Sequence, residues 1–308
     1  MARGVRRRVE TATVAVANFK KSLVRATWRL RPPVLALGGG GARGFAHLGV
    51  LQVLEEADLS VRAIVGTSMG AVVGGMYLAY GSARRATDLW RDALEKELIP
   101  SVRPIGRIPD AEAKEHPLIQ IARRIHNRVV ISFAMNRSTV LDESALVQAL
   151  ESLIPDLEFS DLPRPLVVVA TNLGSGREER LRSGPIRPAM VATSAIPGMV
   201  PSVEIDGREL VDGGVVAEVP AVAARSEGWP VVAVDVSPDV PPLRTDDLVL
   251  DTMMRTQLMT ARLLRQQQMR SATHIIRPDV GGARWAEWGR FDEFIEAGRK
   301  ATLEFLGL

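Results

Sequence analysis

The sequence predicts an α/β fold with a mainly parallel central sheet and helices on both of its faces. The first observation is that short apolar runs, of the length of buried strands, alternate with longer segments of helical periodicity. The second is that glycine-rich turns lead directly from several of these runs into helices, which is typical of parallel strands joined by right-handed crossovers. Sites in such sheets lie beyond the carboxyl ends of the strands, so we expect the chemistry at these turns.

The expected elements follow one another over most of the 308 residues, and no internal repeat is apparent. Strands are expected at 34–37, 62–66, 165–172, 230–236 and 274–277, with a hairpin formed by 177–183 and 200–211. Helices are expected at 44–57, 69–80, 83–98, 142–153, 219–227, 245–270 and 290–304. With 46% hydrophobic and 24% charged residues, the composition fits one large globular domain, which we place at residues 32–308.

Before this domain, residues 1–31 form a basic N-terminal arm. It holds nine basic residues against Glu10, a net charge of +8, whereas the rest of the chain holds 30 basic and 35 acidic residues. Apolar residues recur in the arm at the spacing of one helical face: Val5, Val9, Ala12, Val16, Phe19 and Leu23. With Trp28 nearby, this pattern predicts a helix that lies on an anionic membrane surface. A helix packed on the body, or on a second copy of the chain, fits the pattern equally well.

The first strand, at 34–37, leads into a run of four glycines, and Ala42, Arg43 and Gly44 then open a helix. A loop of this kind aims several backbone N–H groups at one point, and the positive end of the helix dipole reinforces them. It can therefore bind either an oxyanion or a phosphate group.

The second strand ends in Gly66-Thr67-Ser68-Met69-Gly70, which places a serine between two glycines. This is the pattern of a nucleophile elbow, a turn so sharp that the positions flanking the serine can carry almost no side chain. The turn exposes the Ser68 Oγ for attack on a substrate. Because ordinary glycine-rich turns share the pattern, its weight comes from the motifs around it.

Residues 99–140 interrupt the alternation of strands and helices. Four prolines punctuate a segment in which arginines stand beside isoleucine, valine and phenylalanine. The composition fits a lid over an acyl-chain groove, and a surface insertion without a role fits it as well.

Further along, Asp212 ends an apolar run and is followed by Gly213 and Gly214. Taken alone, this pattern is better explained as an Asp-Gly hairpin turn. Together with the glycine run and the serine turn, it supplies a carboxylate that could accept the Ser68 proton.

These three motifs together resemble the patatin-like phospholipase family, in its bacterial branch and in the related neuropathy-target-esterase catalytic domains. The resemblance continues in the blocks 42–51, 192–198 and 211–220 and covers roughly residues 34 to 300. It implies a three-layer α/β sandwich and a serine lipid acyl hydrolase, of phospholipase A or lysophospholipase type, that works without a catalytic histidine and without a cofactor.

The resemblance also implies the roles of individual residues. Ser68 would be the nucleophile of a Ser–Asp dyad and Asp212 its base, with Arg43 supporting the glycine loop or the anionic intermediate. The glycines divide between the oxyanion hole (Gly39, Gly40 and Gly41) and the two motifs (Gly66, Gly70, Gly213 and Gly214). The sequence departs from the family pattern at Glu218, where asparagine is usual, and at Asn172, where aspartate is usual. Because an unperturbed aspartate, with a pKa of about 3.9, is a poor base, either burial raises the pKa of Asp212 or the Ser68 proton leaves late in the transition state.

Two alternatives use the same residues differently. Ser68, Asp212 and His274 occur in the chain order of an α/β-hydrolase triad, although His274 falls inside an expected strand. Gly39-x-Gly41-x-x-Gly44 also matches a dinucleotide-binding fingerprint, with Asp58 as the acid expected about twenty residues further on. This second alternative leaves the serine turn and Asp212 without a role.

Cysteine and histidine content bears on the metal ions and the cellular location that we expect for the protein. There are no cysteines, which is compatible with a reducing cytoplasm, and the four histidines are far apart, so we expect no metal site. We expect a phospholipid or another lipid ester as substrate and no nucleic acid. The expected location is cytoplasmic, with the arm at the inner face of the membrane or in a homo-oligomer contact.

Overall fold

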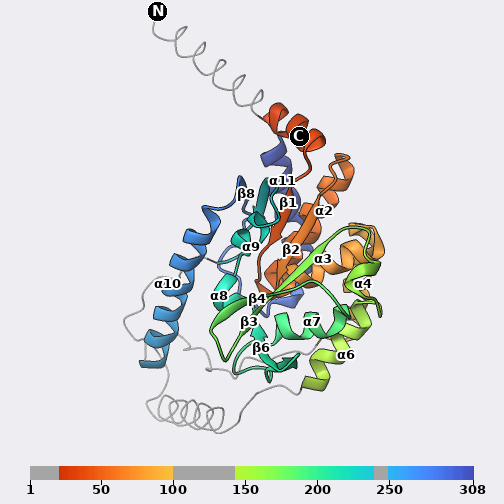
Figure 1. Ribbon diagram of the computed structural model, residues 1–308. Helices are drawn as coiled ribbons and strands as arrows, with labels where there is room; N and C mark the ends of the chain where they lie inside the picture. The colour runs from red at the N-terminus through yellow and green to blue at the C-terminus, as the bar shows by residue number, and fades with distance from the viewer. Residues whose placement is uncertain (1–20, 100–142, 239–248) are drawn as a thin grey trace, which may run out of the picture.

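The computed structural model describes residues 21–99, 143–238 and 249–308, which form an eight-stranded sheet covered by helices (Figure 1). The strands are β1 (Val34–Leu37), β2 (Ala63–Thr67), β3 (Leu166–Asn172), β4 (Arg177–Leu181), β5 (Val203–Ile205), β6 (Arg208–Asp212), β7 (Val231–Val234) and β8 (His274–Ile276). The helices are α2 (Ala46–Glu56), α3 (Met69–Tyr80), α4 (Ala83–Glu95), α6 (Glu143–Leu153), α7 (Ile186–Ser194), α8 (Gly214–Ala217), α9 (Ala221–Arg225), α10 (Val249–Met269) and α11 (Phe291–Leu306). Short 3-10 helices lie at η1 (Gly41–Phe45), η2 (Phe159–Asp161) and η3 (Trp288–Arg290).

The sheet is mainly parallel, as predicted. Strands β3, β2, β1, β7 and β8 pair in that order and all run in the same direction. Strands β4 and β6 pair antiparallel with β3, and β5 pairs antiparallel with β6.

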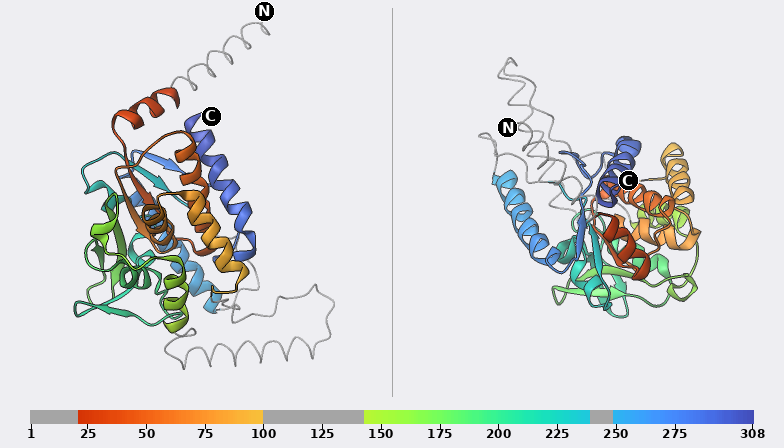
Figure 2. Two further views of the ribbon diagram at one scale, coloured as in Figure 1. Left: turned by 90° about the vertical axis from the view of Figure 1, so that its right-hand side faces the viewer. Right: turned by 90° about the horizontal axis from the view of Figure 1, so that it is seen from above.

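Both faces of the sheet are buried, so the molecule has three layers. Along β1, Leu35 and Leu37 enter the larger core, whereas Val34 and Ala36 enter the smaller one, as the alternation of side chains along a strand requires. Helices α2, α3, α4, α7 and α11 cover the larger core, and α8, α9 and α10 cover the smaller core. Figure 2 shows the two helical layers on opposite sides of the sheet.

The predicted hairpin of 177–183 with 200–211 is wrong. β4 pairs with β3, and the later segment divides into β5 and β6, which pair with each other. Helix α7, which was not predicted, lies between β4 and β5 in the sequence. Its Pro188 stands in the first turn, where a helix tolerates the missing N–H, but a proline there makes the helical pattern easy to overlook.

Residues 21–30, the last part of the predicted arm, form a helix that packs on the domain, as one of the two alternatives for the arm expected. The Trp28 side chain is buried, its Nε1 donates to the Ser60 carbonyl at 2.7 Å, and its ring lies 6.4 Å from that of Phe305. Trp28 therefore belongs to the protein core and cannot face lipid. Residues 1–20, and all of the predicted lid except Ile99, lie outside the described residues.

Candidate active site

Three strands bring Ser68 and Asp212 together. β4 occupies one side of β3, so β2 and β6 share the other side. β2 runs along the first half of β3 and ends with Thr67 opposite Val169. β6 runs the opposite way along the second half and ends with Asp212 opposite Ala170. The two strands thus meet end to end on consecutive residues of β3, which places the serine after β2 beside the aspartate that closes β6.

The Ser68 turn has the strained geometry of an elbow. Ser68 has φ 51°, in the left-handed region that non-glycine residues rarely adopt. A Cβ on Gly66 would lie 2.4 Å from the Ala71 Cα, and one on Gly70 would lie 2.3 Å from the Leu37 carbonyl oxygen. Both flanking positions therefore require glycine, for the reason that the sequence pattern suggested.

A buried threonine, which the sequence analysis missed, fixes this turn from behind. The Ser68 N–H donates to Thr193 Oγ1 at 2.8 Å, and the Thr193 hydroxyl in turn donates to the Val169 carbonyl. The backbone of Asp212 is held in a similar way, since its N–H donates to the Ala195 carbonyl and its own carbonyl accepts from Thr171 Oγ1. α7 and β3 thus hold both residues of the pair. No local pattern distinguishes Thr193 from an ordinary helical threonine, because its role arises from contacts distant in sequence.

Asp212 lies in a setting that suits a base. Burial raises its pKa from the ordinary value of 3.8 to about 6. Three other groups affect it less: the Gly214 N–H, which donates to Oδ1 at 2.7 Å, and the Ser68 hydroxyl lower the pKa, and the negative charge of Glu218 raises it. Asp212 is thus a stronger base than a free aspartate and is largely ionised above pH 6. The acid ends β6 and leads into α8, so the Asp-Gly hairpin is excluded.

The glycine loop passes next to this pair, and one of its three predicted oxyanion donors is already engaged. The Gly39 N–H donates to the Glu218 carbonyl at 2.8 Å, so the prediction is wrong for Gly39. The N–H groups of Gly40 and Gly41 have no acceptor among the described residues. Arg43 braces the loop, since its Nε donates to the Gly40 carbonyl at 3.0 Å.

A buried histidine supports the loop from its other side. His47 Nε2 lies 2.7 Å from the Gly38 carbonyl oxygen, and burial lowers the pKa of His47 to about 4. The ring is therefore neutral at pH 7, and because Nε2 faces a carbonyl it must carry the proton. His47 holds the loop and does not exchange protons near neutral pH.

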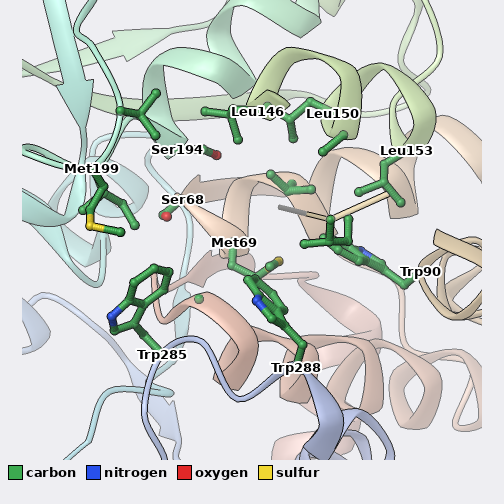
Figure 3. A pocket seen from close by; sticks show the side chains of 16 residues that line it. Ser68, Met69, Trp90, Leu146, Leu150, Leu153, Ser194, Met199, Trp285 and Trp288 are labelled. Atoms are coloured by element: carbon green, nitrogen blue, oxygen red, sulfur yellow. The ribbon is translucent and has the colours of Figure 1, made fainter. Parts of the chain in front are cut away.

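An apolar pocket opens at Ser68 (Figure 3). Leu146, Leu150 and Leu153 of α6 form one side, and three tryptophans lie opposite them. Trp90 comes from α4, whereas Trp285 and Trp288 lie three residues apart, almost 200 residues later in the chain. Such a lining is suited to an apolar ligand, and Ser68 and Ser194 supply hydroxyl groups to it.

The two alternative sites do not assemble. His274 is three strands away from β2, roughly 14 Å at the usual strand spacing, and lies level with Ile64 rather than with Ser68. Asp58 precedes β2, whereas a dinucleotide-binding acid belongs at the carboxyl end of that strand. The triad with His274 and the nucleotide fingerprint are both wrong.

No group of three or more His, Cys, Asp or Glu side chains in the described part of the chain is placed to hold a metal ion. Within the same residues, no helix is both long enough and apolar enough to cross a bilayer.

Comparison with known proteins agrees with the motifs. The patatin-like phospholipase family model matches residues 35–225. An uncharacterized NTE family protein of Mycobacterium tuberculosis is 32% identical over 189 residues, which are 60% of this chain and 43% of the relative. Patatin-like phospholipase domain-containing protein 6 of Mus musculus is 26% identical over 292 residues, which are 86% of this chain and 20% of that protein. The chain therefore spans less than half the length of these curated relatives.

Among solved structures, VipD from Legionella pneumophila aligns with 90% of this chain and 67% of its own, at 16% identity and a TM-score of 0.47. The family model, by contrast, matches well over half of the sequence and includes all three motifs. The chain belongs to the patatin-like phospholipase family.

Proposed function

We propose that the protein is a serine lipid acyl hydrolase, a carboxylic ester hydrolase of phospholipase A or lysophospholipase type, that uses a Ser68–Asp212 dyad. The observation that carries this proposal is the end-to-end meeting of β2 and β6, which sets a strained serine that lines the pocket beside a buried carboxylate of raised pKa. A hydroxyl becomes nucleophilic when a base of this kind lies beside it.

In the proposed first step, Ser68 Oγ attacks the ester carbonyl carbon as its proton passes to Asp212. The N–H groups of Gly40 and Gly41 stabilise the oxyanion, and loss of one such donor typically costs about a hundred- to a thousandfold in rate. Collapse of this intermediate breaks the bond to the leaving alcohol, which takes the proton from Asp212. Water, deprotonated by Asp212, then attacks the acyl carbonyl carbon. The bond from this carbon to Ser68 Oγ breaks, Oγ takes the proton back from Asp212, and the fatty acid is released.

The substrate class follows from the pocket. Apart from Ser68, Ser194 and Gly41, its lining consists of aliphatic, methionine and tryptophan side chains, which suits the acyl chain of a phospholipid or another lipid ester. Of the two histidines within the described ranges, His47 faces the Gly38 carbonyl with a lowered pKa and His274 is distant, which favours Asp212 as the base, so we expect modest turnover.

Membrane attraction, which was expected of the whole arm, is proposed here for residues 1–20 alone. Residues 1–20 hold Arg3, Arg6, Arg7, Arg8 and Lys20 against Glu10, and we infer that they attract the anionic inner face of the cytoplasmic membrane. Contact with a second copy of the chain is the competing use of the same residues.

A fluorophosphonate probe and a panel of phospholipids, lysophospholipids and neutral esters test the dyad proposal. Ser68→Ala should lose both labelling and hydrolysis, whereas the matched variant Ser194→Ala, whose hydroxyl lines the same pocket, should keep the label (Figure 3). Labelling that persists in folded Ser68→Ala, or an active wild type that is never labelled at Ser68, contradicts the proposal.

A further inference from the structure

The pocket that opens at Ser68 is closed at its other end. Figure 3 shows Ser68 and Met199 at one end of the pocket, with Trp90 and Leu153 at the opposite end. Both closing side chains belong to the protein core, since Trp90 is 3% and Leu153 is 1% exposed. An acyl chain that enters beside Ser68 therefore runs toward tightly packed side chains and not toward solvent.

Two helices run along the pocket and set its depth. On α6 the lining residues recur at the spacing of one helical face: Leu146, Ala149, Leu150 and Leu153. From the first to the last of these residues the helix rises about 10 Å. On α3, Met69 and Val72 line the pocket, whereas Met76, one turn further on, is fully buried outside its lining. Both helices therefore place the closed end about two helical turns away from the serine.

The closed end is held in place from behind. The Trp90 ring packs edge-to-face on Phe45, with 5.0 Å between the ring centroids. The Leu153 carbonyl accepts a hydrogen bond from the Tyr80 hydroxyl at 3.0 Å, which ties the end of α6 to the end of α3. Neither side chain can move aside for a longer acyl chain without disturbing these contacts, and a packed core tolerates little added volume.

We propose that Trp90 and Leu153 set the length of acyl chain that the site accepts, and that the limit is roughly eight to ten carbon atoms. This inference rests on the proposed hydrolase function. An extended chain advances about 1.2 Å per bond, as the backbone of a strand does over the three bonds of each residue. A pocket about 10 Å deep therefore takes roughly eight bonds beyond the ester carbonyl. Each methylene that enters raises kcat/KM about fourfold, and a methylene that cannot enter adds nothing.

The test is kcat/KM of the full chain for a series of saturated 4-nitrophenyl esters of increasing acyl length. In the wild type, kcat/KM should rise up to the limit and then stop rising. In Trp90→Ala and Leu153→Ala, which open the closed end, the rise should continue. The ratio of variant to wild type should then grow about fourfold with each methylene beyond the wild-type limit. Because each ratio compares two proteins on the same ester, differences in ester solubility cancel.

Two further variants serve as controls. Trp28→Ala also removes a buried tryptophan, but at the end of the strands away from the pocket, and should leave the limit unchanged. Ala149→Leu adds volume to the middle of the α6 face and should move the limit to shorter chains. The inference is overturned by an unchanged limit in folded Trp90→Ala and Leu153→Ala, or by a limit that moves equally in Trp28→Ala. If neither variant of the closed end folds, an unchanged limit in Ala149→Leu overturns it.

If the wild type hydrolyses no ester, the proposed function fails, and binding then tests the inference separately. Saturated fatty acids of increasing length replace the esters, and their affinity is measured from the fluorescence of the tryptophans that line the pocket. In the wild type the affinity should stop rising at the proposed limit, whereas in Leu153→Ala it should continue to rise. Affinities that level off at the same length in both proteins would overturn the role of the closed end.

Discussion

The two ends of the parallel strands differ in how their polar groups are satisfied. Where the strands begin, Trp28 is buried with its N–H bonded to Ser60, and the backbone joins neighbouring segments through bonds such as Val34 N–H to Pro230 and Arg62 N–H to Pro33. Where they end, Ser68 has a strained backbone, Asp212 is a buried carboxylate, and the N–H groups of Gly40 and Gly41 have no acceptor within the described ranges. Unfavourable features thus gather at one end, which is where substrate would compensate for them, while the other end stabilises the fold.

The largest difference is expected between substitutions of Asp212, where the strands end, and of His274, where they begin. Asp212→Asn should reduce ester hydrolysis by about a thousandfold or more, since the proton of Ser68 then has no acceptor. His274→Gln, in an edge strand beside Phe305, should stay within about twofold of wild type. Steady-state kinetics on one soluble ester measure both variants, and the reverse ranking would restore a histidine-dependent mechanism.

Trp28→Ala tests the opposite end. Removal of this buried side chain and its bond to Ser60 should lower the free energy of unfolding by about 3–5 kcal/mol. The rate per folded molecule should stay near that of wild type, because Trp28 is far from the serine turn. Urea unfolding combined with active-site titration separates the two quantities. If Trp28→Ala keeps the wild-type free energy of unfolding but loses hydrolysis, the idea that one end of the strands stabilises the fold and the other carries the chemistry is contradicted.

Asp212→Asn should also stabilise the protein in a pH-dependent way. Since the pKa of Asp212 is raised on folding, its stability contribution is complete below its ordinary value of 3.8 and is lost as pH rises through about 6. The variant should therefore gain about 1–3 kcal/mol over wild type at pH 8 and nothing below pH 3.8. Thermal unfolding across this range measures the gain. A gain that is constant with pH excludes desolvation of the carboxylate as its cause.

The smallest effect is expected from deletion of residues 1–20, which leaves the helix at 21–30 in place. Hydrolysis of a soluble ester and Tm should both change little, whereas salt-sensitive binding to anionic liposomes should disappear. Screening supports this test, because the Debye length falls from about 10 Å at 0.1 M salt to about 3 Å at 1 M. A truncated protein that dissociates from a larger assembly instead would identify these residues as a contact between copies.

The sequence predicted the mainly parallel sheet because its strands are continuous apolar runs, and Ser68 because a glycine on each side of it is a local steric requirement. It did not predict Thr193 or the engagement of Gly39, since both depend on partners more than a hundred residues away. The sequence also did not predict that β4 and β6 pair with β3, because alternation identifies a strand but not its neighbour in the sheet.

The membrane-facing reading of the arm failed at Trp28 for another reason. An amphipathic pattern with an aromatic residue describes a helix that covers apolar surface, whether that surface is lipid or protein. Here the surface near Trp28 is the protein itself, through Ser60 and Phe305.

The end-to-end meeting of β2 and β6 also has a consequence for synthesis of the chain on the ribosome. The residues of the serine turn are made early, but Thr193, which holds the turn, and Asp212, which we propose as its base, follow 125 and 144 residues later. Domains generally fold as units, so the turn and its partners are expected to form together. On the proposed mechanism, truncated products that end before β6 lack the proton acceptor and should be inert toward lipid esters.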